Sequence, residues 1–358
     1  MTDSNEMNQE RVVALIKRRF PDYTYKTIAA FTVWLTYISD FSDNKRHIRH
    51  VSDLVENEIG IIERIFQDTT IIQYLFFGRE VATPTIDITT LVVTNEKLGS
   101  GSFGSVVSGK VNGENVAVKT FNELKKIQIY RQYADWCVFM KEFTLLNKLQ
   151  NTGIVGKLYG VRWNSGNWQM IVERHYIQSL DWKSHTLNTT ENTIQIVREL
   201  FTVIGTIHKI TGYVHGDIKP DNIMIDIIDD EPVLQIIDFG LSEKIHVLQK
   251  NHKYVQTIFW RSPELLECIP SDLVLADAWA TAITAFDIMA GRCLMYDIGA
   301  RIDINEDDML ALLRCRCLNR STIPCEWIEY IDPELIEYAN EIYEKYIVNA
   351  KYRIGFAV

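Results

Sequence analysis

The feature that most constrains this chain is the short polar loop His215–Asn222, with the sequence His-Gly-Asp-Ile-Lys-Pro-Asp-Asn. It follows a helix-type segment with an apolar face and leads directly into the β-type run 223–225. A fold that contains it must therefore present carboxylate, ammonium and amide groups between two buried elements. On its own the octapeptide also fits an ordinary turn, because Gly, Pro, Asp and Asn are common turn residues.

The side chains of this loop suit phosphoryl transfer. A carboxylate such as Asp217 can orient an alcohol, an ammonium such as Lys219 can sit on a phosphate, and the amide oxygen of Asn222 suits Mg²⁺. The reaction asks the protein for positioning and charge neutralisation more than for covalent chemistry. Further on, the apolar run 233–237 delivers Asp238 followed by Phe and Gly. An acid at this strand end is a candidate second metal ligand, because the glycine lets the chain turn sharply.

A glycine-rich segment lies upstream and has the spacing G-x-G-x-x-G, with Gly99, Gly101 and Gly104. Glycines let the backbone approach phosphates and offer N–H groups to them. Dinucleotide-binding segments share this spacing, but there the glycines open a helix. Here β-type runs follow, together with the hairpin signal Asn112-Gly113. The glycines are therefore predicted to lie at the tip of a β-hairpin.

A second hairpin brings back a strand that ends in Lys119. Burying an unpaired ammonium on an apolar strand is too costly, so Lys119 is expected to have a charged partner. The natural candidate is Glu142. It shares a helix face with three leucines at i+3, i+4 and i+7, namely Leu145, Leu146 and Leu149. We therefore expect the Glu142 carboxylate to point inward and to pair with Lys119.

Composition narrows the class of protein. With 358 residues and 47% hydrophobic residues, the chain has room for about two folded domains. Its net charge of −10 argues against a nucleic-acid binder that relies on a broad basic face. Six scattered cysteines and no secretory pattern at the start indicate reduced thiols in an intracellular protein, cytoplasmic or nuclear. The longest apolar run, around 28–38, is too short to span a bilayer.

The first part of the chain differs from the rest. Residues 1–80 read as helices with long apolar stripes, and residues 81–90, which include Pro84 and several Thr, read as a connector. No chemistry is visible in this region. Its apolar surface is expected either to pack on the following domain or to bind a regulator.

From residue 91 the ordered motifs resemble those of a eukaryotic-type serine/threonine protein kinase. The resemblance covers residues 91–358 and implies an α+β, bilobal protein-kinase-like fold with an added N-terminal helical region. The small lobe would span about 91–173 and the large lobe about 174–358. The implied ligands are ATP with Mg²⁺ or Mn²⁺, and the implied acceptor is a hydroxyl of a protein substrate.

The resemblance also implies roles for individual residues. Asp217 would be the catalytic base, Lys219 would touch the γ-phosphate, and Asn222 and Asp238 would hold the metal. Glu264 would pair with Arg353. The implied nucleotide-binding set is Leu98, Gly99, Gly101, Ser102, Phe103, Gly104, Val106, Ala117, Lys119, Glu142 and Glu173.

Several positions bear on the subclass. Lys219 and Thr257 resemble the serine/threonine pattern and not the tyrosine pattern. Gly216 replaces the Arg of the H-R-D motif, which removes the side chain that receives a phosphate on the activation segment. Ser262 replaces the Ala of A-P-E. The Ile/Asn/Asp-rich composition fits an AT-rich genome, such as that of a large DNA virus whose proteins act in a host cell.

Two other functions remain open at this point. A small-molecule phosphotransferase of the aminoglycoside or choline kinase type has a similar His-Gly-Asp loop. Against it stand Lys219, the sequence Asp238-Phe239-Gly240 and the stretch 260–264, which resembles a shelf for protein substrates. A pseudokinase acting as a binding module would be favoured by loss of a metal or base position, but Lys119, Asp217, Asn222 and Asp238 are all present.

Overall fold

The computed structural model describes residues 18, 90–101, 104–121, 129–164, 167–245, 256–269, 272–295, 305–318, 320–347, 353, 355 and 356. Apart from Arg18 and Thr90, the helices predicted for residues 1–80 and the connector lie outside these residues. The nucleotide-binding candidates Ser102 and Phe103 also lie outside them.

The chain divides into two compact units. Unit 1 holds the described residues up to Thr144 together with Lys157–Arg174, and unit 2 holds Leu145–Gly156 and the residues from His175 onward.

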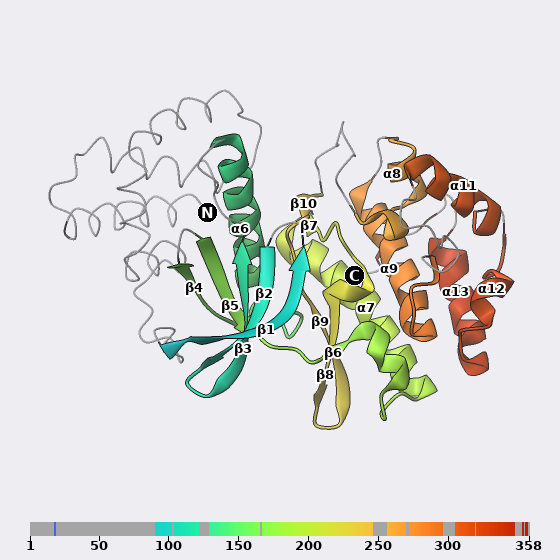
Figure 1. Cartoon of the computed structure of the whole chain (residues 1–358). Helices are drawn as coiled ribbons and strands as arrows, with labels where there is room; N and C mark the ends of the chain where they lie inside the picture. Colours follow the sequence, from blue (N-terminus) through green and yellow to red (C-terminus); the bar gives the residue numbers. More distant parts are fainter. Residues whose placement is uncertain are drawn as a thin grey trace. The chain divides into compact units, whose positions relative to one another are not determined.

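Unit 1 is built on a five-stranded antiparallel sheet with the order β1-β2-β3-β5-β4 (Figure 1). The tight turn Asn112-Gly113, in which both residues have positive φ, joins β2 to β3. The strands are β1 (Val92–Gly101), β2 (Gly104–Val111), β3 (Glu114–Phe121), β4 (Leu158–Asn164) and β5 (Asn167–Glu173).

The three glycines of the glycine-rich segment lie on the β1–β2 hairpin, as predicted. Gly99 pairs with Val106, and Gly101 pairs with Gly104. Gly104 has a φ of 159°, and a Cβ atom there would lie 2.1 Å from the backbone oxygen of Thr120. Glycine is therefore required at this position by the fold itself. At Gly99 and Gly101 a Cβ would meet no atom of the described residues within 4 Å.

One helix, α6 (Ile129–Leu149), supplies the apolar partner of the unit 1 sheet. Phe139 on α6 packs edge-on against Phe121 with ring centroids 5.1 Å apart, and stacks on Trp168 at 4.9 Å. A separate apolar cluster joins β2, β3 and β5 through Val111, Val116, Val118 and Ile171. Alternation along β3 therefore sends successive side chains into two different cores.

Unit 2 is mostly helical in its described residues and carries two small sheets, β7–β10 and β6–β8–β9. The loop His215–Asn222 lies between β7 and β8 (Figure 1). The strands are β6 (Ile177–Gln178), β7 (Tyr213–Val214), β8 (Ile223–Ile228), β9 (Glu231–Ile236) and β10 (Glu243–Lys244). The helices are α7 (Thr190–Thr211), α8 (Pro263–Leu266), α9 (Leu273–Ala290), α11 (Glu306–Arg316), α12 (Cys325–Ile328) and α13 (Ile336–Tyr346).

The core of unit 2 is centred on α9. The helix begins at the N-cap Asp272, whose side chain accepts from the Val274 N–H, and ends at Gly291 in the left-handed conformation. By length and composition alone α9 could cross a membrane, but 89% of its apolar window is buried inside the protein. Around it, Phe286 packs against Trp327 of α12 at 5.3 Å, and Trp327 packs against Tyr343 of α13 at 6.4 Å.

The expected pair of Glu264 and Arg353 is present in unit 2. The Arg353 Nη1 donates to a carboxylate oxygen of Glu264, and its Nε donates to the Tyr346 carbonyl at 2.9 Å. The guanidinium also lies 4.9 Å from the ring centroid of Trp279. Burial lowers the pKa of Arg353, and the charge of Glu264 opposes that change. The pair thus joins the end of the described chain to α8 and α9.

Replacing Arg353 by Ala is expected to lower the free energy of unfolding by about 3–5 kcal/mol, because Glu264 would be left as an uncompensated buried charge. Urea denaturation of the purified protein measures this change. The matched control is Lys345→Ala, which removes an exposed pair with Glu341 and should cost less than about 0.5 kcal/mol. Equal losses in both variants would contradict the structural role of the buried pair.

Candidate active site

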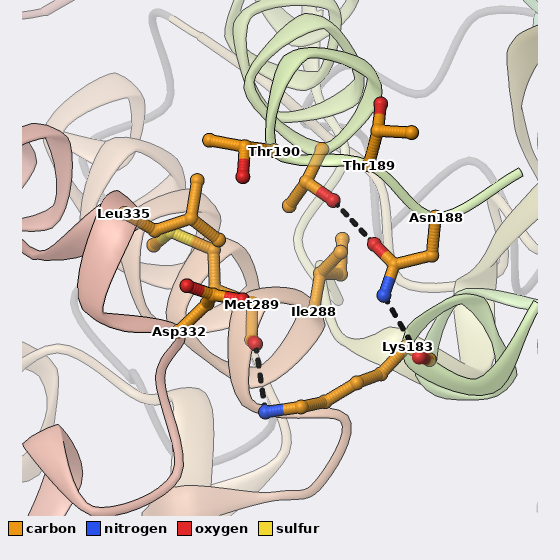
Figure 2. A pocket seen from close by; sticks show the side chains of 9 residues that line it. Lys183, Asn188, Thr189, Thr190, Ile288, Met289, Asp332 and Leu335 are labelled. Carbon is orange, nitrogen blue, oxygen red and sulfur yellow. Dashed lines mark hydrogen bonds between the residues drawn. The ribbon is translucent and has the colours of Figure 1, made fainter.

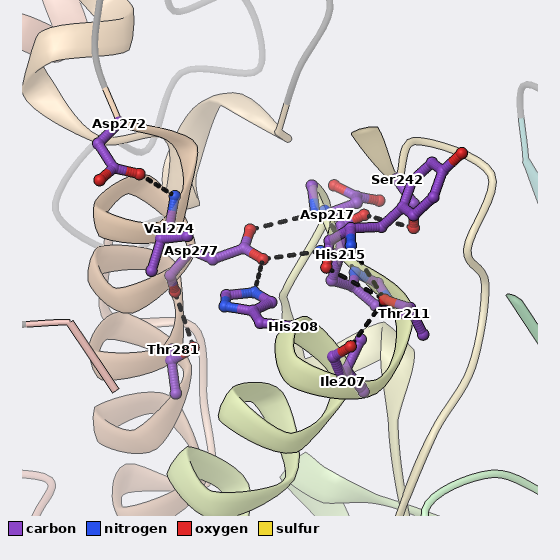
Figure 3. A network of polar contacts seen from close by, with 12 residues as sticks. Ile207, His208, Thr211, His215, Asp217, Ser242, Asp272, Val274, Asp277 and Thr281 are labelled. Atoms are coloured by element: carbon purple, nitrogen blue, oxygen red, sulfur yellow. Dashed lines mark hydrogen bonds and ion pairs between the residues drawn. The ribbon is translucent and has the colours of Figure 1, made fainter. Parts of the chain in front are cut away.

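One carboxylate on α9, that of Asp277, holds the loop His215–Asn222 (Figure 3). Asp277 Oδ2 accepts from the backbone N–H of His215 at 2.7 Å, and Oδ1 accepts from the N–H of Gly216 at 3.1 Å. The same carboxylate lies 2.9 Å from Nε2 of His208 on α7. Asp277 is almost fully buried. Its charge is therefore stabilised entirely by hydrogen bonds within unit 2.

The conformation of the loop depends on Gly216, which has a φ of 77°. Glycine adopts this left-handed conformation at little cost. Both backbone groups of Gly216 are used, because its N–H bonds Asp277 and its carbonyl accepts from the N–H of Gln256 at 2.9 Å. The loop is further fixed by Ser242, whose hydroxyl donates to the His215 carbonyl at 3.0 Å.

Asp217, Lys219 and Thr257 form a compact polar cluster. Oδ1 of Asp217 accepts from the Thr257 N–H at 3.1 Å and from the Thr257 hydroxyl at 2.7 Å. Lys219 Nζ lies 2.8 Å from Oδ2 of Asp217 and donates to the Thr257 hydroxyl at 2.9 Å. The ammonium therefore stays near the carboxylate while part of its side chain remains exposed. An acceptor hydroxyl and a phosphate could be oriented by such a cluster.

The two candidate metal ligands in unit 2 lie on neighbouring strand ends. Asn222 precedes β8, and its Nδ2 donates to the Asp217 carbonyl at 2.7 Å and to Oδ2 of Asp217 at 3.1 Å. Asp238 follows β9 and is joined to Asn222 by the bond from the Ile237 N–H to the Asn222 carbonyl at 3.0 Å. The amide donation orients the Asn222 side chain by fixing its nitrogen. Its oxygen and the Asp238 carboxylate are the kind of ligands that Mg²⁺ prefers.

Asp238 also has unusual backbone geometry, with a φ of 62°. Its Oδ1 accepts from the N–H of Gly240 at 3.2 Å. The following Phe239 is fully buried and packs on the His215 ring at 5.1 Å. A left-handed non-glycine residue costs roughly 1–3 kcal/mol and persists where its surroundings impose it. The buried Phe239 side chain provides this constraint by anchoring the turn.

In unit 1 the predicted pairing of Lys119 with Glu142 is confirmed. Nζ of Lys119 lies 2.6 Å from Oε1 and 2.8 Å from Oε2 of Glu142, which is 4% exposed. The two residues come from β3 and α6. Because both carboxylate oxygens contact the ammonium, the Lys119 head group is fixed in position instead of moving freely on its long stem.

The remaining nucleotide-binding candidates that the structure describes also lie in unit 1. Leu98 is on β1, Val106 pairs with Lys119 across β2 and β3, and Ala117 pairs with Val172. Glu173 ends β5, and its carboxylate accepts from the Lys157 N–H at 2.9 Å.

The base of the glycine-bearing hairpin is held by Arg174. Its guanidinium forms a two-pronged contact with Glu96 on β1, at 2.6 and 2.9 Å, and donates to the Ser108 hydroxyl on β2 at 2.7 Å. The bond with Arg174 holds the pKa of Glu96 below its ordinary value. The β1–β2 register shifts between Val93 and Gly99, so side chains supply bonds where the backbone ladder is irregular.

Sequence patterns assign no role to Asp277 and mark Thr257 only through its resemblance to the serine/threonine pattern. The position of Asp277 on the largely apolar segment 273–290 was the available signal for it, because a buried charge requires partners. No local pattern indicates that Thr257 contacts Asp217, since 40 residues separate them.

A small pocket of about 50 Å³ lies elsewhere in unit 2, between α7, α9 and the segment around Asp332 (Figure 2). Lys183 lines it and donates to the Met289 carbonyl at 3.4 Å. None of the predicted site residues lines this pocket. In the part of the chain that the structure describes, no group of three or more His, Cys, Asp or Glu side chains could hold a metal.

Comparison with known proteins adds an independent observation. Residues 92–349 match the family described as Protein kinase domain. Among curated relatives, Probable serine/threonine-protein kinase gdt4 of Dictyostelium discoideum is 27% identical over 59% of this chain and 12% of its own length. Mitogen-activated protein kinase 13 of Pan troglodytes is 25% identical over 61% of this chain and 59% of its own length. Inhibitor of nuclear factor kappa-B kinase subunit epsilon of Mus musculus is 30% identical over 55% of this chain and 29% of its own length. The chain spans less than two thirds of each relative.

Replacing Asp277 by Asn is expected to loosen the loop His215–Asn222, because an amide offers one acceptor oxygen and would turn its NH₂ toward a donor. Amide hydrogen exchange at His215 and Gly216 should accelerate at least about ten-fold, corresponding to the loss of hydrogen bonds to a charged group. The control is Asp272→Asn on the same helix, since Asn caps helices as well as Asp does. Unchanged exchange in Asp277→Asn would show that this carboxylate does not hold the loop.

Proposed function

The chain belongs to the protein kinase domain family, and on this premise we propose that it transfers the γ-phosphate of ATP to serine or threonine hydroxyls of proteins. The observation that carries the proposal is the cluster of Asp217, Lys219 and Thr257 in unit 2. It combines a carboxylate, an ammonium and a hydroxyl in one place. Relatives named as serine/threonine kinases support the choice of acceptor.

In the proposed reaction Asp217 accepts a hydrogen bond from the acceptor hydroxyl and orients it for in-line attack. Lys219 neutralises charge that develops on the transferred phosphate. In unit 1, Lys119 fixed by Glu142 contacts the α- and β-phosphates, and the glycine-bearing hairpin covers them. Asn222 and Asp238 would hold Mg²⁺ or Mn²⁺, which supplies charge neutralisation at the phosphates when bound.

The alternative of a small-molecule phosphotransferase is less well supported. It accounts for the His-Gly-Asp loop but not for Thr257 on Asp217 or for the ordered stretch Ile258–Leu266, in which Trp260 donates to Asp287 at 2.8 Å. A binding module without catalysis would not need Asp217, Lys219 and Thr257 to be held together.

We also propose that activity does not depend on phosphorylation of the activation segment. Gly216 has no side chain with which to receive a phosphate, and its two backbone groups are already bonded. Tyr254, one of the few hydroxyl residues of this segment, lies outside the described residues. Control would then fall to the N-terminal region or to abundance of the protein.

Asp217→Asn should reduce phosphate transfer by about 10²–10⁴-fold, because orientation of the acceptor acts mainly in the transition state. ATP affinity, measured as a thermal shift, should change little. The assay supplies labelled ATP with protein and small-molecule acceptors, followed by phosphoamino-acid analysis. Asp221→Asn, an exposed acid in the same loop, is the control and should transfer at a near-normal rate. Undiminished turnover in Asp217→Asn, or label chiefly on tyrosine or a small molecule, would refute the proposal.

Protein made in bacteria and treated with phosphatase should retain its activity within about two-fold, since no phosphate-receiving Arg is present at residue 216. Mass spectrometry confirms the unphosphorylated state, and Tyr254→Phe serves as the second arm. Loss of nearly all activity in either arm would mean that another cation receives a phosphate on the segment.

A further inference from the structure

Strand β1 is irregular shortly before the glycine-bearing turn. Val93 pairs with Gly109 on β2, and the next pair joins Lys97 to Val107. Between these two pairs β1 has three residues, whereas β2 has only Ser108. Such a bulge interrupts the backbone ladder and is common beside functional sites, where it bends the strand. Side-chain contacts then become important for how β1 lies on β2.

Arg174, the residue that follows β5, bonds both strands at the bulge. Its guanidinium contacts the Glu96 carboxylate on β1 through Nη2 at 2.6 Å and through Nη1 at 2.9 Å. Nη1 also donates to the Ser108 hydroxyl on β2 at 2.7 Å. A neutral bond from the Thr94 hydroxyl to the Ser108 carbonyl, at 3.0 Å, adds to this contact. Exposed ion pairs usually contribute little, but two-pronged guanidinium–carboxylate contacts are an exception because their geometry is fixed.

The partner of Arg174 on β2 lies on a particular face of the sheet. Directly opposite residues of an antiparallel pair share a face, and so do residues two apart on one strand. Ser108 is opposite Ala117 on β3, and Val106 is opposite Lys119. Ser108 therefore shares its face with Val106, Ala117 and Lys119, which are nucleotide-binding candidates. Arg174 is bonded to this face through the Ser108 hydroxyl.

The bulge also determines where the following part of β1 lies. Leu98 and Gly99, two further nucleotide-binding candidates, come shortly after Glu96 on the same strand. Because strand side chains alternate between the faces, a shift of one residue in register would send Leu98 to the opposite face. By holding Glu96 next to Ser108, Arg174 opposes such a shift.

We propose that Arg174 is a positioning residue for nucleotide binding. It fixes the bulged stretch of β1 on β2, and so sets where Leu98 and Gly99 lie relative to Ala117 and Lys119. This inference rests on the proposed function, since ATP is the ligand proposed for these residues. Arg174 acts through β1 and not by touching the nucleotide. Its loss would therefore weaken ATP binding more than it slows turnover.

The test measures ATP binding to the full-length protein by calorimetry with excess Mg²⁺. Arg174→Ala should raise the Kd for ATP about ten-fold, as expected for lost hydrogen bonds to a charged group. The kcat at saturating ATP should stay within about two-fold, because Asp217 and Lys219 belong to unit 2. Without nucleotide, amide exchange across residues 97–99 should accelerate at least about ten-fold.

Two further variants separate the two-pronged contact from charge alone. Arg174→Lys should be intermediate in both measurements, because an ammonium keeps the charge but cannot hold two partners with the same geometry. Glu96→Gln is the milder variant in case Arg174→Ala does not fold, and it should raise the Kd for ATP by about two- to five-fold. Added to Arg174→Ala, Glu96→Gln should have no further effect, because both changes remove the same contact.

The matched control is Tyr159→Phe, which removes another side-chain bond of the same sheet. This bond runs from the Tyr159 hydroxyl on β4 to a carboxylate oxygen of Glu114 on β3, at 3.0 Å. The ring of residue 159 stays in place. The Kd for ATP and the exchange across residues 97–99 should remain at their wild-type values.

The outcomes separate the positioning role from the proposed function. An unchanged Kd for ATP in both Arg174→Ala and Glu96→Gln would overturn the positioning role, and so would fully additive effects of the two changes. A rise in Kd that is accompanied by an equal rise in Tyr159→Phe would also overturn it, because that pattern reports general loosening of the sheet. A wild-type protein that binds ATP but transfers phosphate to no acceptor would refute the proposed function alone, whereas a wild-type protein that binds no ATP would refute both.

Discussion

The buried carboxylate of Asp277 is the interaction on which the described site in unit 2 depends. Its two oxygens accept from two consecutive backbone N–H groups of the loop His215–Asn222. The same carboxylate also contacts His208 on α7. An isolated charge in such a place would be prohibitively unfavourable, and it is tolerated because three donors surround it. Within the loop Asp277 bonds backbone amides and no side chain, so it sets the path of the loop independently of the side chains that the loop carries. The loop then presents Asp217 and Lys219 from a fixed base.

Each unit fixes its own candidate residues in a different way. In unit 1 an ion pair from a strand and a helix fixes Lys119, and Arg174 braces the base of the hairpin at a break in the backbone ladder. In unit 2 the polar groups are held mainly by backbone bonds, with Gly216 and Gln256 both in the left-handed region. Pre-organisation of this kind lowers the cost of orienting substrates when they bind.

Much of this arrangement could be predicted from sequence, for identifiable reasons. The hairpin was predictable because Asn112-Gly113 favours one turn type, and the partner of Lys119 was predictable because a buried ammonium needs a carboxylate. The contact of Thr257 with Asp217 was not, since 40 residues separate them and no local pattern marks it. The positive φ of Gln256 runs against residue preference, so a propensity argument would have placed glycine there.

The three hairpin glycines have different reasons to be glycine. At Gly104 the fold itself forbids a side chain, because a Cβ would lie 2.1 Å from the Thr120 oxygen, whereas Gly99 and Gly101 have open space around them. Folding therefore selects for Gly104, whereas close approach of a bound phosphate would be a separate reason for glycine at the other two. In a descendant chain that lost its chemistry but kept its fold, Gly99 and Gly101 would be free to drift while Gly104 would persist. The residues at positions 99 and 101 would therefore report whether ligand binding is retained, and the residue at position 104 would report only whether the fold is retained.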